Sequence, residues 1–230
     1  MNLPAFFADV PKLRLRDPLA ELLGCAEGGV FEYSYADAVR LAGHSCPTVA
    51  AAYWLTWLAL AELYPRSLPQ RGGIKVELRD DARTGSTGVV ATVIQMLTGA
   101  AGGSGFKGIR GLHARAGLQR FMPGLPLSLR FIRLDTGEAV DAAVDLSMAP
   151  EDPALAPALA RAVGGSLCNE ELRSLGRTWQ ERVRHLLLDL GHDPGVFIIR
   201  RVDRGAAPLM PPLVRHAPER SRPLAREPRS

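Results

Sequence analysis

The longest apolar run of the chain extends from Val49 to Leu63 and follows a proline at position 47. Pro47 suits the first position of a helix and Pro65 ends the pattern, so we predict a helix over Pro47–Tyr64. Apolar residues cover most of its circumference, which is typical of a helix that lies central to the core or is shared with a partner subunit. The run is shorter than the roughly 20 residues that cross a bilayer and contains Glu62, so we expect no membrane span.

Shorter periodic segments predict further strands and helices. Ile74–Leu78 alternates apolar with charged residues, the period of a half-buried strand. Asp135-Thr136-Gly137 joins two more predicted strands, Leu127–Leu134 and Glu138–Leu146, into an antiparallel hairpin. Further helices are predicted at Pro18–Gly24, Ser34–Leu41, Gly88–Leu97 and Asn169–Leu190, and a last strand at Val196–Val202. The fold expected is α+β, a mainly antiparallel sheet packed with one long buried helix and a few further helices.

Composition and charge divide the chain into two parts. With 230 residues and 47% hydrophobic composition, the chain can bury a core, and we predict a single α+β domain over residues 1–203. Gly205 to Ser230 holds five arginines against two glutamates, so +3 (5 − 2) of the net charge of +4 lies there. We expect a disordered Pro- and Arg-rich tail over residues 204–230. The remainder is almost neutral and shows no basic groove, which predicts no nucleic-acid partner.

The cysteines and the N-terminus bear on the compartment. Cys25, Cys46 and Cys168 cannot form a paired disulfide framework, and no Cys-x-x-Cys pair indicates a zinc ribbon. Met1–Val10 lacks the basic start and the apolar core of a secretion signal. We therefore expect a cytoplasmic protein.

Potential chemistry is concentrated where the Ala42-Gly43 turn meets the long helix. His44 and Cys46 lie two residues apart directly before Pro47, which places both at a predicted helix N-terminus. The exposed amides and the positive end of the helix dipole favour the thiolate of Cys46, the form that binds metals or acts as a nucleophile. The alternative is structural, a packed cysteine beside a histidine that caps a turn.

A set of motifs in a fixed order resembles a known family. These are Gly43-His44-Ser45-Cys46-Pro47, the long helix, a strand, Ile94-Gln95-Met96-Leu97-Thr98-Gly99, and a glycine loop that ends in Gly105-Phe106-Lys107-Gly108. Together they resemble the family of the formylmethanofuran dehydrogenase E-subunit over roughly residues 34–145. The resemblance implies an α+β core that usually dimerises and binds a metal, often zinc, near the His and the Cys. The C-terminal zinc finger of some members is absent, because Cys168 is the only cysteine after Cys46.

Departures from the family pattern reduce the expected ligand set. Thr48 stands where the family usually has glycine, and Ala100 where it often has cysteine. His44 and Cys46 remain as metal ligands, whereas zinc takes three protein ligands and a water, or four protein ligands. We rank His113 first as the third ligand, because imidazole suits zinc, iron or nickel better than an isolated carboxylate does. The alternatives are acidic: Glu77, Asp80 and Asp81.

Two further binding hypotheses concern the glycine loop and the aromatic residues. The loop Gly99–Gly108 follows a helix, whereas a phosphate loop precedes one, so it is expected to terminate the helix. Lys107, one of three lysines in the chain, is either an anchor for an anionic ligand or a surface lysine. Cys46-Pro47 also fits a haem-thiolate site, and its apolar wall would come from Tyr53, Trp54, Trp57 and Phe106.

Three functions follow from these observations. The first is a homodimeric metal-binding protein, with His44 and Cys46 as ligands, that takes a small anionic or cofactor-like ligand or donates metal to a partner. The second is an enzyme that uses the metal or the Cys46 thiolate on a small molecule. The third is a scaffold subunit whose helix Pro47–Tyr64 docks on a partner.

Overall fold

The structure, a computed structural model, describes residues 3–203, and the predicted tail over residues 204–230 lies outside them. Its main sheet has five strands in the order β4-β3-β5-β6-β7. Their bounds are Ile74–Leu78 (β3), Gln119–Phe121 (β4), Leu129–Arg133 (β5), Ala139–Val144 (β6) and Phe197–Arg201 (β7). β3 and β4 pair in parallel and the other neighbours pair antiparallel. The expected α+β fold with a mainly antiparallel sheet is confirmed.

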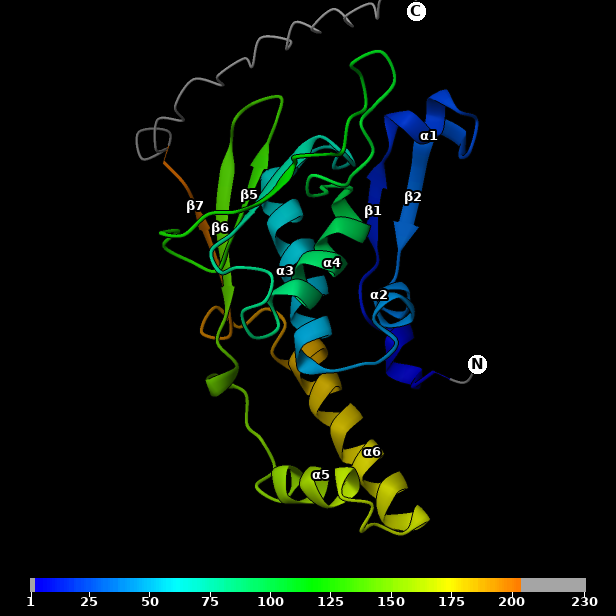
Figure 1. Ribbon diagram of the computed structural model, residues 1–230, viewed down its shortest axis with the longest axis vertical. Coiled ribbons are helices and arrows are strands. Elements are labelled where there is room, and N and C mark those ends of the chain that lie inside the picture. Colours follow the sequence, from blue (N-terminus) through cyan, green and yellow to red (C-terminus); the bar gives the residue numbers. More distant parts are fainter. Residues whose placement is uncertain (1–2, 204–230) are drawn as a thin grey trace, which may run out of the picture.

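The helices of residues 3–203 gather mainly around α3. Their bounds are Pro18–Leu22 (α1), Tyr35–Ala42 (α2), Pro47–Leu63 (α3), Thr87–Thr98 (α4), Leu155–Val163 (α5) and Asn169–Arg184 (α6). The predicted long helix is confirmed to within one residue, because Pro47 begins α3 and Tyr64 caps it. α3 lies between the five-stranded sheet on one side and α4 with the hairpin of β1 (Leu13–Arg16) and β2 (Val30–Tyr33) on the other (Figure 1). None of the helices in the described range has both the length and the hydrophobicity needed to cross a membrane.

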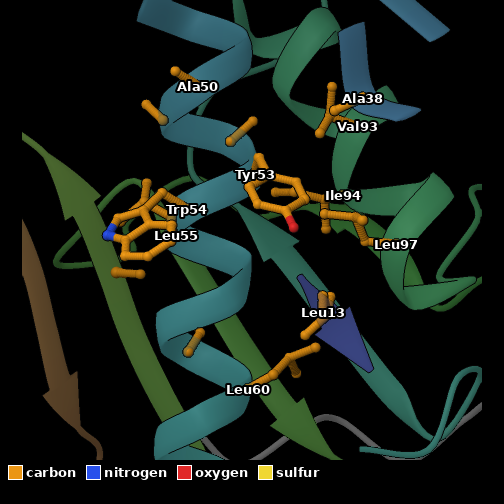
Figure 2. Close-up of a cluster of buried hydrophobic side chains, with 14 of the residues drawn as sticks. Leu13, Ala38, Ala50, Tyr53, Trp54, Leu55, Leu60, Val93, Ile94 and Leu97 are labelled. Carbon is orange, nitrogen blue, oxygen red and sulfur yellow. The ribbon is translucent and has the colours of Figure 1, made fainter. Parts of the chain in front are cut away.

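The core is built around α3. Every residue of α3 from Val49 to Thr56 is buried. In Figure 2, Tyr53 extends towards Ile94 of α4, whereas Trp54 lies on the opposite side of α3. Tyr53 donates its hydroxyl proton to the Pro11 carbonyl at 2.8 Å, and Trp54 Nε1 donates to the Gly191 carbonyl at 2.5 Å. This part of α3 is enclosed by its own chain, so it does not offer the docking surface that the scaffold hypothesis assigned to it.

The face of the sheet that points away from the core carries a row of alternating charges. The register aligns one residue from each strand, in the order Arg120, Glu77, Arg130, Asp141 and Arg200. Arg130 donates to Asp141 through Nε at 2.6 Å and through Nη2 at 2.9 Å. This hydrogen bonding outweighs burial and raises the pKa of Arg130 above its ordinary value. Ile74, Val76 and Leu78 alternate with Lys75 and Glu77 along β3, and they point to the opposite, core face.

The sequence patterns did not predict three strands and one helix of the fold. β1 (Leu13–Arg16) and β2 (Val30–Tyr33) form a separate antiparallel hairpin, and β4 adds three residues to the main sheet. α5 begins at Leu155, and Pro157 lies in its first turn, where a missing N–H leaves no helical hydrogen bond unmade. α5 packs on α6, and the pair extends away from the sheet (Figure 1). α6 continues into a π-helical turn, His185–Asp189, which completes the predicted helix Asn169–Leu190 to within one residue.

Candidate functional site

His44 lies in the turn between α2 and α3. Gly43 ends α2 in the left-handed conformation, with φ of 76°, and its N–H donates to the Val39 carbonyl at 2.8 Å. His44 is exposed, and its Nδ1 lies 3.0 Å from the Ala42 carbonyl oxygen. A hydrogen bond from Nδ1 to this carbonyl orients the ring and leaves Nε2 available to a ligand.

Ser45 ties the turn to two other elements. Its hydroxyl oxygen lies 2.9 Å from the hydroxyl of Tyr35, at the start of α2. Its carbonyl accepts hydrogen bonds from Trp179 Nε1 at 2.8 Å and from Gln180 Nε2 at 3.3 Å, both on α6. Burial raises the pKa of Tyr35 above its ordinary value, so this hydroxyl stays protonated. The turn is therefore held in one conformation by α2 and α6.

Cys46 is the N-cap of α3, as its position before Pro47 predicted. Its Sγ accepts a hydrogen bond from the N–H of Val49 at 3.5 Å, and its carbonyl accepts one from Ala50 at 3.0 Å. The side chain is half-buried. The thiol accordingly has a structural role at the helix start, and it remains partly accessible to a ligand.

His113 and Lys107 lie in the segment 99–118, which follows the C-terminal end of α4. This segment is at the opposite end of the α3–α4 layer from the start of α3 (Figure 1). The length of the 12-residue helix α4 corresponds to about 18 Å. His113 has φ of 59°, and Lys107 is exposed. The structure thus does not bring either residue to His44 and Cys46.

The aromatic residues of the haem hypothesis do not form one wall around Cys46. Trp54 and Trp57 stack on each other with ring centroids 5.0 Å apart. Phe106 is 45% exposed in the segment 99–118. The Tyr53 hydroxyl and Trp54 Nε1 donate hydrogen bonds to backbone carbonyls in the core.

The three acidic alternatives for a third ligand lie in different surroundings. Glu77 forms an ion pair with Lys75 at 2.5 Å, on the face of β3 opposite to its core-facing residues. Asp81 is exposed and accepts a hydrogen bond from the N–H of Arg83 at 3.0 Å. Asp80 lies in the wall of a pocket that also includes Thr48, two residues beyond Cys46. Of these three, Asp80 shares a cavity with the start of α3.

This pocket has a volume of about 200 Å³ and lies where α3 and α4 both begin. Its polar wall is formed by Thr48, Asp80, Ser86, Thr87 and Ser128. Its apolar wall is formed by Ala51, Ala52, Leu55, Leu78, Val90, Leu129, Val144 and Leu146. The arrangement places hydroxyl groups and one carboxylate beside an apolar surface, a combination typical of small-molecule sites.

Sequence reasoning missed Ser86 and Thr87 as site residues and included Asp80 only among the alternatives to His113. Asp80, Ser86 and Thr87 lie at the two ends of the polar segment between β3 and α4. A polar segment that joins a strand to a helix start is a common place for a ligand site, and this pattern could have identified them. The prediction centred on His44 and Cys46, and it considered phosphate binding only for the glycine loop, which follows α4 and was expected to terminate that helix. A loop that precedes a helix presents free backbone amides, whereas a loop that follows one does not.

The described residues do not assemble a complete metal site. No group of three or more His, Cys, Asp or Glu side chains within residues 3–203 could hold a metal ion. His44 and Cys46 therefore remain a pair of donors, one short of the three protein ligands that a catalytic zinc ion takes.

Comparisons with known proteins gave similarity among solved structures. No protein-family model matches the chain, and no curated protein matches it. Among solved structures, the chain is similar to an FmdE-like protein from Syntrophus aciditrophicus. FmdE is the E-subunit of a tungsten formylmethanofuran dehydrogenase. The identity is 19%, the similarity covers 75% of each chain, and the TM-score is 0.39. A TM-score of this size does not establish a shared fold.

Proposed function

We propose that this protein binds a small molecule in the pocket between the N-terminal ends of α3 and α4. The observation that carries the proposal is the wall of the pocket, in which hydroxyls and a carboxylate from three separate segments converge beside apolar side chains. Small-molecule sites combine an apolar surface with a few converging polar groups in this way. The clamped turn at Ser45 adds rigidity on one side of the pocket, which lowers the entropic cost of binding.

A pocket-filling variant tests the proposal. Val90 lines the pocket, whereas the neighbouring Val89 is 38% exposed and does not. We expect hexanol, added to ¹⁵N-labelled protein, to shift the amide signals of Thr48 and Thr87. Val90→Trp should abolish these shifts and Val89→Trp should preserve them. Equal shifts in both variants, or none in the unmodified protein, would overturn the proposal.

Metal binding by His44 and Cys46 is the second candidate. It is favoured by the contact between His44 Nδ1 and the Ala42 carbonyl, because metal-ligating histidines usually donate their other ring N–H to such a group. Since the described residues offer only two clustered donors, we propose that the remaining ligands come from a bound molecule or from a second copy of the chain in a homodimer. This pair would then suit transient metal handling better than a resident zinc ion.

Elemental analysis of protein purified without chelator tests this second candidate. We expect Cys46→Ala and His44→Ala to remove bound metal while the protein stays folded. Cys46→Ala also loses the N-cap contact with the Val49 N–H, so its melting temperature should fall slightly. His113→Ala examines the third-ligand prediction directly, and unchanged metal in this variant contradicts it. An ultraviolet-visible spectrum of the same samples shows whether the protein binds haem.

The finer functional statements remain proposals of the same kind. A homodimer, a cytoplasmic location, an anionic ligand held by Lys107, and catalysis through a metal or the Cys46 thiolate all rest on sequence arguments. Lys107 lies in the segment 99–118, away from the pocket, so its ligand would occupy a separate site (Figure 1).

A further inference from the structure

The charge of the pocket is set by two opposing features. The first is the positive end of each helix dipole, because both α3 and α4 begin at the pocket wall. The first N–H groups of a helix have no partner within the helix. Cys46 accepts hydrogen bonds from the N–H groups of Val49 and Ala50, and that of Thr48 donates to no acceptor within residues 3–203. At α4, the N–H of Thr87 donates to the Thr84 carbonyl at 3.1 Å and that of Val89 to the Ser86 carbonyl at 3.0 Å, so α4 contributes chiefly the positive end of its dipole. By themselves, the two dipole ends favour an anion.

The second feature is Asp80, the one charged side chain among the described residues that line the pocket. It follows β3 and stands in the same wall as Ser86 and Thr87 at the start of α4. A carboxylate in this position supplies the negative charge that two helix N-termini attract. The pocket therefore already contains its own anion.

The charged residues next to Asp80 in the sequence do not line the pocket. Asp81 follows Asp80, and Asp145 lies between the lining residues Val144 and Leu146. Arg79 contacts Asp80 at 3.4 Å in a partly exposed pair, and Arg83 contacts Asp81 at 3.6 Å in a fully exposed pair. Three carboxylates and two guanidinium groups thus belong to the two segments 79–83 and 144–146. An anionic ligand would therefore be repelled by Asp80, and a cationic ligand would be repelled by the positive ends of the two helix dipoles.

We infer that the pocket takes an uncharged ligand with a hydroxyl head and a short hydrocarbon body; this inference rests on the proposed function. A hydroxyl group donates to Asp80 and accepts from the hydroxyls of Thr48, Ser86 or Thr87, which neither a carboxylate nor an ammonium group can do. The hydrocarbon part packs against Leu55, Leu78 and Val144. A volume of about 200 Å³ suits a small alcohol or polyol. The anionic ligand expected from the sequence does not suit this pocket.

Three probes of equal chain length separate the head groups: hexanol, hexanoate and hexylamine. Dissociation constants come from NMR titration of the unmodified protein near pH 7. We expect hexanol to bind most tightly, and hexanoate about tenfold or more weakly, which is the effect of one close like charge at a helix start. Asp80→Asn should strengthen hexanoate binding by about the same factor, because the helix starts are then uncompensated. Asp81→Asn is the matched control, one residue further on, and should leave all three affinities unchanged.

The outcomes separate this inference from the proposed function. If hexanoate binds the unmodified protein as tightly as hexanol, or if Asp80→Asn leaves hexanoate binding unchanged, the inference is wrong and the pocket remains a binding site. If none of the three probes binds, or if Val90→Trp does not weaken any of them, the proposed function fails. Should Asp80→Asn lower the melting temperature strongly, Asp80→Ser provides the same charge removal with a different side chain.

Discussion

Asp17 joins three segments that are distant in the sequence. It is 4% exposed and is the N-cap of α1, where its Oδ1 accepts from the N–H of Leu19 at 3.0 Å. The same oxygen accepts from Arg115 Nη2 at 2.6 Å, and Oδ2 accepts from Arg71 Nη1 at 2.9 Å. Arg71 also donates to the Met96 carbonyl near the end of α4. One carboxylate therefore links α1, the end of α4 and the segment 99–118.

Replacing Asp17 with alanine should destabilise the fold by about 4 kcal/mol. Loss of an N-cap costs about 1 kcal/mol. Breaking a buried ion pair by removing one partner costs about 3–5 kcal/mol, because the remaining charge is uncompensated. Arg115 is 7% exposed, so its charge would be buried and uncompensated without Asp17, whereas Arg71 is more accessible to water. The two costs share one side chain and are not additive, so the lower part of the combined range is expected.

Urea unfolding followed by circular dichroism measures this effect. Asp37→Ala is the control, because Asp37 also serves a helix start, accepting from the Ser34 N–H at 2.8 Å, but its ion pair with Arg40 is exposed. We expect a cost of about 1 kcal/mol for the control. A cost for Asp17→Ala no larger than that of the control would refute the reasoning.

The pH dependence of stability gives a second readout of the same carboxylate. Burial acts to raise the pKa of Asp17, but hydrogen bonding to Arg71 and the charge of Arg115 outweigh it and hold the pKa below its ordinary value. A group with a lowered pKa in the folded state contributes stability that is present above its unfolded pKa and is lost as the pH falls through the folded value. The unmodified protein should therefore lose stability below about pH 4, and Asp17→Ala should lose less over this range.

Three further predictions concern other contacts. Gly72 has φ of +78° and a β-carbon there would overlap the guanidinium of Arg115, so Gly72→Ala should lower the free energy of unfolding in urea by about 2 kcal/mol. Gly124 has φ of +95° but no heavy atom within 4 Å of a β-carbon, so Gly124→Ala should cost less. Equal costs for the two variants would contradict the clash. Trp179→Phe removes the hydrogen bond to Ser45, so amide exchange at residues 44–46 should accelerate, at a cost of about 1 kcal/mol in stability; unchanged exchange rules out the clamp. Hydrogen bonds from the Cys168 N–H and from Arg161 lower the pKa of Glu171 to about 2, so a carboxyl NMR titration should place it there, and a midpoint near its ordinary value contradicts the capping geometry.

Much of the fold was readable from local pattern. α3 could be predicted because two prolines bound a run, Val49 to Leu63, that is apolar except at Thr56 and Glu62, and each proline has a defined effect on a helix. The hairpin of β5 and β6 could be predicted because Gly137, with φ of 73°, supplies the turn. α2 carried its own start signal, since Ser34 and Asp37 form a capping box.

The elements that were missed depend on pairing between distant segments. β1 has four residues in which leucine alternates with arginine, and its partner β2 follows only after α1. β4 has three residues and lies parallel to β3, so no turn indicates the pair. The charge row from Arg120 to Arg200 also requires the register of five strands. Local periodicity cannot supply such registers.

The site illustrates the same limit. The position of His44 and Cys46 at a helix start followed from Pro47 and is confirmed. The choice of His113 as third ligand was a guess about proximity, and the segment 99–118 lies at the other end of α4 (Figure 1). Asp80 was included among the alternatives, but its place in the pocket depends on how α4 packs against α3.

The order of elements nevertheless contains the information that selects between Asp80 and His113. A helix, one strand and a second helix follow one another as α3, β3 and α4, and short connections make each element reverse direction. The two helices therefore run the same way, and their starts lie at one end of the layer with the segment 79–86, whereas the segment after α4 lies at the other end. Of the two candidates, Asp80 in the segment 79–86 is therefore at the same end of the layer as Cys46, and His113 in residues 99–118 is not. If metal is found in the purified protein, Asp80→Asn should reduce its occupancy more than His113→Ala, and the reverse order would contradict this account of the topology.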